Sequence, residues 1–185
     1  SLRILFEQLR DIRNDVRIPL ILMGYLNPIM KFGFEAFCQK CVECGIDGVI
    51  IPDLPFKDYE ETYKPIADRY DIRVIMLITP ETSEARVREI DEHTNGFIYM
   101  VSSAATTGAQ KDFDSQKQAY FKKIQDMHLR NPRMVGFGIS NKQTFDAACA
   151  NSSGAIIGSR FVTLLNEAEG DAEKAITQLK ENVGR

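Results

Sequence analysis

The sequence predicts an α/β fold built on a parallel sheet, and three observations lead to this prediction. Short apolar runs of strand length alternate with helical patterns along most of the chain. The runs are continuous rather than alternating, as in Leu20–Met23 and Gly48–Ile51, which is typical of strands buried on both faces. Glycine and polar residues gather where these runs end. Six strand–helix units follow one leading helix, so a doubly wound sheet and a (β/α)8 barrel both fit.

The expected elements follow from the period of the apolar residues and from the turn residues between them. We expect strands at residues 19–25, 48–51, 73–78, 97–101, 134–137 and 155–157, and helices at 1–14, 32–44, 59–70, 85–93, 115–130, 142–150, 161–168 and 171–183. Asn27 and Pro28 should form a turn after the first strand, and residues 102–111 a long polar loop.

The composition is that of one globular domain, and we take residues 1–185 as that domain. Hydrophobic residues make up 44% of the chain and charged residues 26%, which excludes disorder. The net charge of -3 argues against nucleic acid as a partner, because such binding needs a basic face. No apolar run approaches the ~18 residues of a membrane span, and residues 1–7 are typical of an amphipathic helix rather than a secretion signal. We therefore expect a cytoplasmic protein without membrane contact.

Three of the four cysteines, Cys38, Cys41 and Cys44, are spaced three residues apart and raise the question of a metal site. They lie in the amphipathic helical pattern of residues 34–44, on one stripe of the helix. Buried cysteine commonly behaves as a small hydrophobic side chain, and neither histidine lies near this trio in sequence. We therefore favour helix packing over metal binding and expect no metal.

Two glycine-bearing runs, 135–140 and 155–159, carry the strongest signal for a binding site. Each follows a predicted strand and leads into a helical pattern near a hydroxyl residue, Ser140 or Ser159. Glycine lets the backbone approach an anion closely, and the N–H groups of a first helical turn favour negative charge. One such run is often only a turn, but two after consecutive strands favour a phosphate site.

The position of these runs favours the barrel. A doubly wound sheet places its glycine-rich loop after the first strand, whereas a (β/α)8 barrel binds phosphate after its last two strands. A barrel has eight strands and the sequence shows six. We therefore expect an incomplete barrel comprising units three to eight and the helix of unit two, with two further units before Ser1. The strands near Pro19 and Ala155 should be the edges of the gap.

Several segments in order along the chain resemble one known family, the tryptophan synthase alpha chain. They are residues 22–28 (Leu-Met-Gly-Tyr-Leu-Asn-Pro), 45–55 with Pro-Asp-Leu-Pro at its end, 96–102, Thr106-Thr107-Gly108-Ala109, 135–140 (Val-Gly-Phe-Gly-Ile-Ser) and 154–159. The resemblance covers nearly the whole chain and corresponds to the C-terminal three quarters of the family's barrel. Each segment alone is weak evidence, but their combination is specific.

The resemblance implies a carbon–carbon lyase of tryptophan biosynthesis, which cleaves indole-3-glycerol phosphate to indole and glyceraldehyde 3-phosphate by a retro-aldol step. It implies no cofactor in this chain, with pyridoxal phosphate in a partner beta chain, and an alpha2beta2 tetramer. The family's catalytic glutamate and aspartate belong to its first two barrel units, so we expect them before Ser1.

The resemblance also assigns roles to residues of this chain. Gly108, Gly138, Gly158 and Ser159 bind the substrate phosphate; Phe137, Ile50 and Ile156 line the indole pocket, with Tyr99 beside them; Thr107 and Tyr99 support the catalytic groups. The apolar residues would serve equally well as barrel filling. Asp53 would contact the beta chain or simply form a turn.

Two other functions stay open. The chain could be a non-catalytic barrel fragment that binds phosphate or a beta chain without turnover. It could also be another phosphate-handling barrel, an isomerase or synthase of tryptophan or histidine synthesis. Such an enzyme should keep a lysine or aspartate inside the remaining strand ends, and the predicted strands show no lysine there.

Overall fold

A computed structural model describes residues 1–102, 110–136 and 138–185 of the chain and shows an α/β fold with parallel sheets. The chain divides into two compact units. The first comprises Ser1–Met76 with Arg88–Phe97, and the second comprises Leu77–Val87 with Ile98–Arg185. Each unit has its own sheet.

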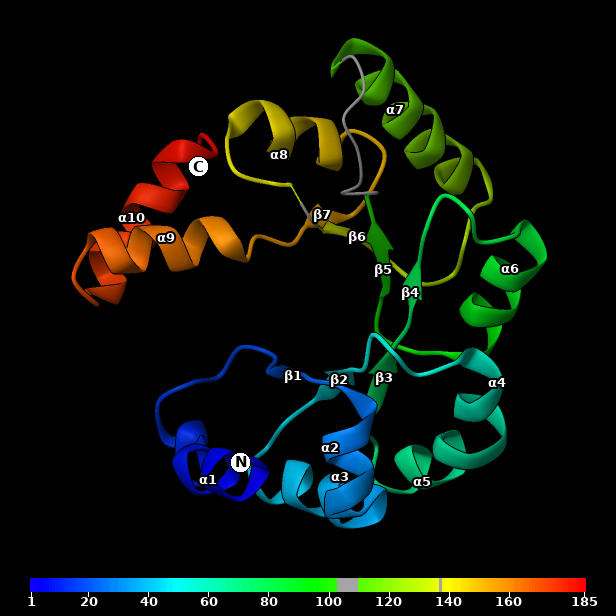
Figure 1. The fold of residues 1–185 in the computed structure, drawn as a ribbon, viewed down its shortest axis with the longest axis vertical. Coiled ribbons are helices and arrows are strands. Elements are labelled where there is room, and N and C mark those ends of the chain that lie inside the picture. Colours follow the sequence, from blue (N-terminus) through cyan, green and yellow to red (C-terminus); the bar gives the residue numbers. More distant parts are fainter. Residues whose placement is uncertain (103–109, 137) are drawn as a thin grey trace. The chain divides into compact units, whose positions relative to one another are not determined.

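The sheet of the first unit has three parallel strands in the order β1 (Ile21–Met23), β2 (Gly48–Ile50) and β3 (Arg73–Ile75) (Figure 1). The central strand β2 is buried along its whole length, as a continuous apolar run predicts. β1 differs, because Ile21 and Met23 are exposed. The exposure follows from its position at the edge of the sheet, where a strand has one neighbour instead of two.

The helices of the first unit are α1 (Leu2–Leu9), η1 (Ile12–Asn14), α2 (Leu26–Phe32), α3 (Phe34–Glu43), α4 (Phe56–Asp58), η2 (Tyr59–Tyr63), α5 (Lys64–Arg69) and the end of α6 (Glu84–His93). Aromatic rings join the helices. Phe6 of α1 packs against Phe32 and Phe37, and Phe34 packs edge-on against Tyr63 at 4.7 Å between ring centres. This aromatic cluster gives the unit a core outside its short strands.

Two helix predictions for this unit need correction. The expected turn at Asn27 and Pro28 is instead the first turn of α2, where proline is tolerated because its missing N–H has no intrahelical partner. The helix expected at 32–44 therefore begins earlier, and it breaks at Gly33, whose φ of 94° lies in the left-handed region. The helix expected at 1–14 ends at Leu9 and is followed by the separate turn η1.

The helix expected at 59–70 is also less regular than predicted. Its first part, η2, is a π-helix, and α5 follows with Pro65 in its first turn. Proline cannot donate an intrahelical hydrogen bond, and its ring crowds the carbonyl four residues earlier. A wider π turn directly before Pro65 relieves that crowding.

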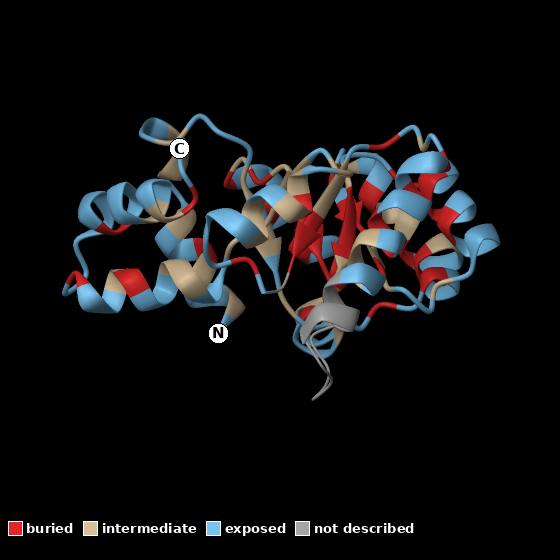
Figure 2. Ribbon diagram, turned by 90° about the horizontal axis from the view of Figure 1, so that it is seen from above, coloured by how far each residue is buried: buried red, intermediate tan, exposed pale blue. Residues whose placement is uncertain are grey.

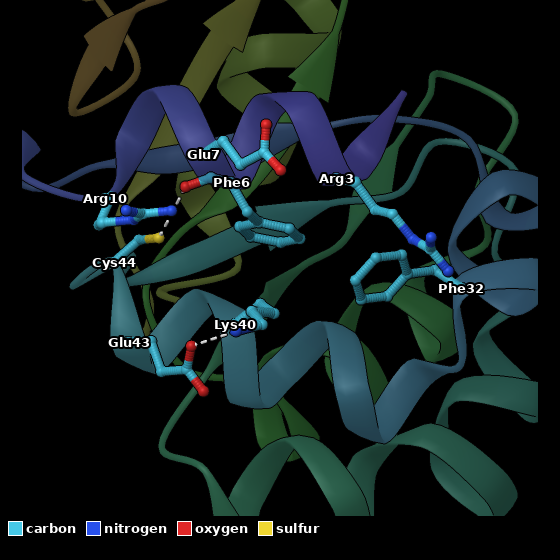
Figure 3. A pocket seen from close by; sticks show the side chains of 8 residues that line it. All are labelled: Arg3, Phe6, Glu7, Arg10, Phe32, Lys40, Glu43 and Cys44. Carbon is cyan, nitrogen blue, oxygen red and sulfur yellow. Dashed lines mark hydrogen bonds and ion pairs between the residues drawn. The ribbon is translucent and has the colours of Figure 1, made fainter.

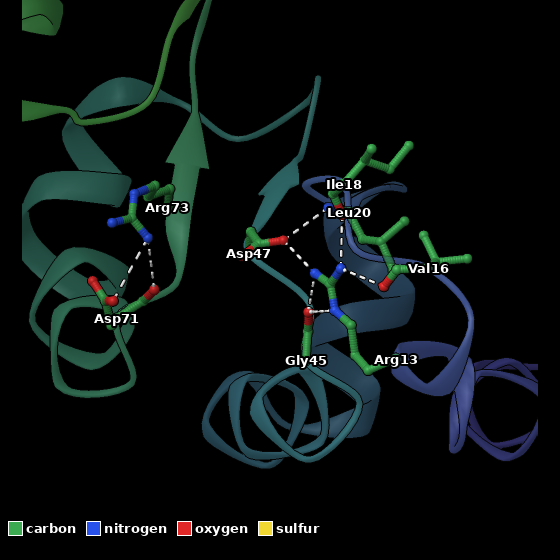
Figure 4. Close-up of polar contacts among 8 residues, drawn as sticks. All are labelled: Arg13, Val16, Ile18, Leu20, Gly45, Asp47, Asp71 and Arg73. Atoms are coloured by element: carbon green, nitrogen blue, oxygen red, sulfur yellow. Dashed lines mark hydrogen bonds and ion pairs between the residues drawn. The ribbon is translucent and has the colours of Figure 1, made fainter.

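Arg13 ties the segment before β1 to the turn before β2 (Figure 4). Its Nε donates to the Gly45 carbonyl at 2.8 Å, and its Nη1 donates to the Ile18 carbonyl at 2.7 Å. Its Nη2 pairs with Asp47 Oδ2 at 2.5 Å, and the same carboxylate oxygen accepts from the Leu20 N–H. The guanidinium thus fixes where β1 starts relative to β2, and it uses the planar fork that lysine lacks.

The sheet of the second unit has four parallel strands in the order β4 (Leu77–Ile78), β5 (Ile98–Val101), β6 (Arg133–Gly136) and β7 (Gly154–Ala155). Its helices are the start of α6 and α7 (Gln110–Asp126), α8 (Lys142–Cys149), α9 (Ser159–Glu167) and α10 (Ala172–Asn182). The last two pack on each other through Leu164, Ala168 and Ala175. Figure 2 shows buried residues concentrated on the central strands and exposed residues on the outward sides of the helices.

The single strand expected at 73–78 is two strands in the structure. β3 pairs with β2, β4 pairs with β5, and Met76 separates them. The two halves of the run have different hydrogen-bonding partners, so a continuous apolar sequence is divided between two sheets. The sequence has no glycine or proline at this point to signal the division.

The two strands expected at the edges of the gap are edge strands. Among the described residues, β1 pairs with β2 alone and β7 pairs with β6 alone. In the described part of the chain, no helix is long and apolar enough to cross a membrane.

Candidate functional site

The two glycine-bearing loops leave the second sheet side by side. β6 and β7 are parallel neighbours, with Met134 opposite Gly154 and Val135 opposite Ala155. The Ile156 N–H donates to the Val135 carbonyl at 2.7 Å, which continues the pairing past the end of β7. In each of these two residue pairs the partner on β7 lies 20 positions after the partner on β6 (154 - 134 and 155 - 135). Gly158 likewise lies 20 positions after Gly138, so the two glycines occupy equivalent positions beyond their strands. The sequence thus places both glycines just beyond the carboxyl ends of adjacent strands, at one edge of the sheet.

The helices that follow these loops begin differently. α8 is closed by a capping box, in which Asn141 Oδ1 accepts from the Thr144 N–H at 2.9 Å. Thr144 Oγ1 accepts in turn from the N–H groups of Ser140 and Asn141. We predicted a hydroxyl residue at this helix start. The cap is instead Asn141, because its carboxamide reaches the helix N–H groups while Ser140 lies one residue further out.

α9 has an open N-terminus. Gly158 is its N-cap residue, and within the described chain no side chain caps this helix. Ser159 is the first helical residue and is exposed. The first N–H groups of a helix have no intrahelical carbonyl to bind, and the helix dipole makes this end positive. Of the two helix starts beside the glycine loops, the start of α9 is the one able to accept an anion.

Both glycines leave room for such an anion. Gly138 is exposed and has φ 75°, a conformation that favours glycine. A Cβ built on Gly158 would have no atom of the described residues within 4 Å, so that part of the chain leaves open space there. Among the described residues, the backbone at Gly138 and Gly158 is therefore uncrowded. The N–H groups at the start of α9 and the hydroxyl of Ser159 are available to an anion.

Tyr99 is fixed against this edge by a contact that the sequence did not reveal. Its side chain is 5% exposed, and its hydroxyl lies over the Cα of Gly136 on the neighbouring strand. A Cβ on Gly136 would lie 2.5 Å from Tyr99 Cε1 and closer still to Oη, so only glycine admits the ring. Burial raises the pKa of Tyr99, which keeps the phenol protonated at neutral pH.

Ser102 secures the same strand end. It is 2% exposed, its hydroxyl donates to the Gly136 carbonyl at 2.9 Å, and its N–H donates to the same carbonyl at 3.2 Å. β5 and β6 are thus joined directly before Gly138. Ser102 appeared in the sequence only as part of a family segment.

The remaining predicted site residues lie in three places. Ile156 directly follows β7 and is half-buried, and Ile50 is a buried residue of β2 in the first unit. Thr107, Gly108 and Phe137 lie outside the described residues. The structure therefore places Gly138, Ile156, Gly158 and Ser159 within one unit, just beyond the carboxyl ends of β6 and β7. Tyr99 is the second residue of β5, and its ring reaches Gly136 at the end of β6.

The cysteine trio packs as helix core. Cys38 and Cys41 are fully buried on α3, and Cys44 Sγ contacts the Phe6 carbonyl at 3.6 Å. Burial raises the pKa of Cys38 to about 11 and that of Cys41 to about 12, so both thiols are protonated at neutral pH. Among the described residues, no group of three His, Cys, Asp or Glu side chains could hold a metal ion.

Asp53 caps helix α2, which lies 27 residues earlier in the sequence. Its Oδ1 accepts from the N–H of Leu26, the first residue of α2, at 2.8 Å. The contact links the loop after β2 to the loop after β1, so the carboxylate has a structural role beyond its own turn.

A cavity of about 350 Å³ lies among α1, α2 and α3 of the first unit (Figure 3). Phe6, Phe32 and Cys44 are its apolar lining, and Arg3, Arg10, Lys40, Glu7 and Glu43 surround them. Lys40 and Glu43 pair with each other at 2.5 Å. None of the predicted site residues that the structure describes lines this cavity, which lies among helices and not at the strand ends.

Comparison with known proteins agrees with the resemblance found in the sequence. A family model of the tryptophan synthase alpha chain matches residues 1–185. The tryptophan synthase alpha chain of Bacteroides fragilis is 79% identical over 180 residues, which cover 97% of this chain and 68% of that protein. The solved tryptophan synthase A-subunit of Pyrococcus furiosus is 27% identical, with a TM-score of 0.85, covering 100% of this chain and 74% of that one.

A structure of the tryptophan synthase complex from the same organism has 25% identity and a TM-score of 0.83, and covers 100% of this chain and 74% of that chain. These structural relatives and the parallel strands confirm the predicted fold class, an incomplete (β/α)8 barrel. Because the family model spans every residue and a relative is 79% identical, the chain belongs to the tryptophan synthase alpha chain family, and its role lies in tryptophan biosynthesis.

Proposed function

We propose that the chain acts in the cleavage of indole-3-glycerol phosphate to indole and glyceraldehyde 3-phosphate, as a carbon–carbon lyase without a cofactor of its own. The observation that carries the proposal is the match of residues 1–185 to the family, together with the pair of glycines at one edge of β6 and β7. The open start of α9 next to Gly158 supplies the N–H groups and the positive end of a helix dipole for the substrate phosphate.

The chemistry explains why a phosphate site matters in an enzyme that does not react at phosphorus. Breaking the bond between indole and the glycerol chain requires a proton on indole C3 and removal of a proton from the glycerol hydroxyl. The electron pair of the broken bond passes to the indole ring, and the hydroxyl carbon becomes the aldehyde. Two acid and base groups must meet these atoms, so the substrate must be held in one position.

In this proposal the chain binds and orients the substrate. Gly138, Gly158 and Ser159 bind the phosphate, with Gly108 beside them. Ile156, Phe137 and Ile50 line the indole pocket, while Tyr99 and Thr107 support the catalytic groups. The family's catalytic Glu and Asp have no counterpart in the resemblance over residues 1–185. The proposed partner is a beta chain that carries pyridoxal phosphate and receives indole, in an alpha2beta2 tetramer.

Release of indole from indole-3-glycerol phosphate tests the proposal. Protein proven by intact mass to comprise residues 1–185 is assayed with and without a tryptophan synthase beta chain. Turnover supports the lyase and excludes the binding-only fragment. Saturable binding of glycerol 3-phosphate without turnover supports the binding-only alternative. Absence of both contradicts each function.

A further inference from the structure

We propose that Lys117 of α7 is an electrostatic contributor to the phosphate site, a role that the glycine loops alone do not reveal. The inference rests on the proposed function, because it assumes that the substrate phosphate lies at Gly138. The observation behind it is a single distance. A Cβ placed on Gly138 would lie 4.0 Å from Lys117 Nζ, the nearest atom to that position in the described part of the chain, apart from the chain neighbours of Gly138.

The position of Lys117 is set by its helix. The next residue along α7 is Gln118. Its Nε2 donates to the Ala147 carbonyl of α8 at 3.3 Å, and its Oε1 accepts from Asn151 Nδ2 at 3.4 Å. One and two turns further on, Phe121 and Ile124 are buried. These contacts hold α7 against its unit, while Lys117 is half-buried and reaches Gly138 with its ammonium.

The positive charge of Lys117 is what this residue adds to the proposed phosphate site. The chain has a net charge of -3, so the protein as a whole repels a phosphate dianion. Glycine N–H groups and the start of α9 contribute partial charges, whereas Lys117 contributes a full positive charge. Its distance from Gly138 is short compared with the Debye length, about 8 Å at physiological ionic strength, so salt in the cell screens the attraction only in part.

The phosphate positions the substrate and does not react. Lys117 should therefore affect the affinity for the substrate and leave the rate of carbon–carbon bond cleavage unchanged. Attraction by a partly exposed ammonium corresponds to about a two- to fivefold change in affinity. The effect should shrink at high salt, since the interaction is between full charges. Lysine binds phosphate as a point charge, so arginine at this position should largely replace it.

Affinity for glycerol 3-phosphate, measured by calorimetry at low and high ionic strength, tests the inference. Lys117→Gln should weaken binding about two- to fivefold at low salt, with a smaller difference at high salt, and Lys117→Arg should stay close to the parent. Affinity for indole, which has no charge, should not change. The matched control is Lys122→Gln on the same helix, where Lys122 Nζ pairs with Asp126 at 2.9 Å, and it should bind like the parent protein.

The outcomes separate this inference from the proposed function. If the parent protein does not bind glycerol 3-phosphate, both are wrong. If the parent binds and Lys117→Gln binds equally well, only the role of Lys117 is overturned. An equal loss in Lys117→Gln and Lys122→Gln would show a general effect of net charge and would also overturn it. Circular dichroism of each variant shows whether the fold is kept.

Discussion

Gly136 shows how one residue without a side chain can determine a site. Its place on β6 lets the buried ring of Tyr99 cross from β5, and its carbonyl accepts two hydrogen bonds from Ser102. The cross-strand register places Tyr99 opposite Met134, so Gly136 is its diagonal neighbour, within reach of an aromatic side chain. Three residues are therefore fixed together at the strand end that leads to Gly138.

Gly136→Ala tests this arrangement. The new methyl group would collide with Tyr99, and a buried ring between two strands has little room to move. We expect a loss of about 1–3 kcal/mol in the free energy of unfolding, measured with urea. Ser102 and Tyr99 would be displaced together, so binding of glycerol 3-phosphate should weaken as well. An unchanged unfolding midpoint would show that the ring does not occupy this position.

The buried thiols of α3 give a pH dependence with a defined sign. Burial raises the pKa of Cys38 from 9.0 to about 11 and that of Cys41 from 9.0 to about 12. Below pH 9 both thiols are protonated in the folded and the unfolded chain, so they do not change stability. Above pH 9 the unfolded chain releases these protons first, and the free energy of unfolding should fall as pH rises toward 11.

Urea unfolding between pH 8 and about 10.5 measures this effect. Other groups titrate in the same range, so the matched control is the double variant Cys38→Ala and Cys41→Ala, whose stability should fall less steeply with pH. Burial also raises the pKa of Cys149, the half-buried thiol of α8, so Cys149→Ser should reduce the slope less than the double variant does. Equal slopes in the parent and the double variant would contradict the account.

At the scale of elements, α8 and α9 differ in what their N-termini are available for. α8 uses Asn141 and Thr144 to bind its own first N–H groups, whereas α9 starts from Gly158 without a side-chain cap in the described chain. Both follow strands of the same sheet. The first helix start is stabilised locally, and the second is where we propose that the substrate phosphate binds.

Asn141→Ala should therefore lower stability and leave phosphate affinity unchanged, whereas Gly158→Ala should lower phosphate affinity and leave stability unchanged. Asn141→Ala removes the cap and should cost about 1 kcal/mol of stability, with little change in the affinity for glycerol 3-phosphate. The new methyl group of Gly158→Ala would have no atom of residues 1–102, 110–136 or 138–185 within 4 Å, so stability should change by less than about 0.5 kcal/mol. Its methyl group would occupy the open space at the start of α9 and should weaken binding about tenfold.

Thermal unfolding and calorimetry on both variants give the comparison. If Asn141→Ala weakened binding as much as Gly158→Ala, the phosphate would depend on α8 as much as on α9. If Gly158→Ala bound normally, the open helix start would have no part in the site.

At the scale of the molecule, the sequence predicted the order and type of the elements better than their limits. In the described part of the chain, each strand lies in or overlaps one of the continuous apolar runs, because burial on both faces is visible in composition. The division of 73–78 into β3 and β4 was not predictable, since it depends on which neighbouring strand each half meets. The start of α2 was missed because Asn27 and Pro28 are typical of both a turn and a first helical turn.

The candidate site was predictable to a similar degree. Gly138 and Gly158 were identified from their positions after consecutive strands, and the observed register places them at one edge of a sheet. The contact of Tyr99 with Gly136 and the approach of Lys117 to Gly138 were not predictable. Both depend on how side chains of separate elements meet in space, which the spacing of residues within one element does not encode.

The backbone amide spectrum of the ¹⁵N-labelled protein, recorded during titration with glycerol 3-phosphate, tests the central claim most directly. The account predicts that the amide signals of Gly138, Gly158 and Ser159 shift together and saturate with one dissociation constant. The start of α8 should respond less, because Asn141 and Thr144 already bind its N–H groups. Saturable shifts confined to other parts of the chain, with these three amides unmoved, would contradict it.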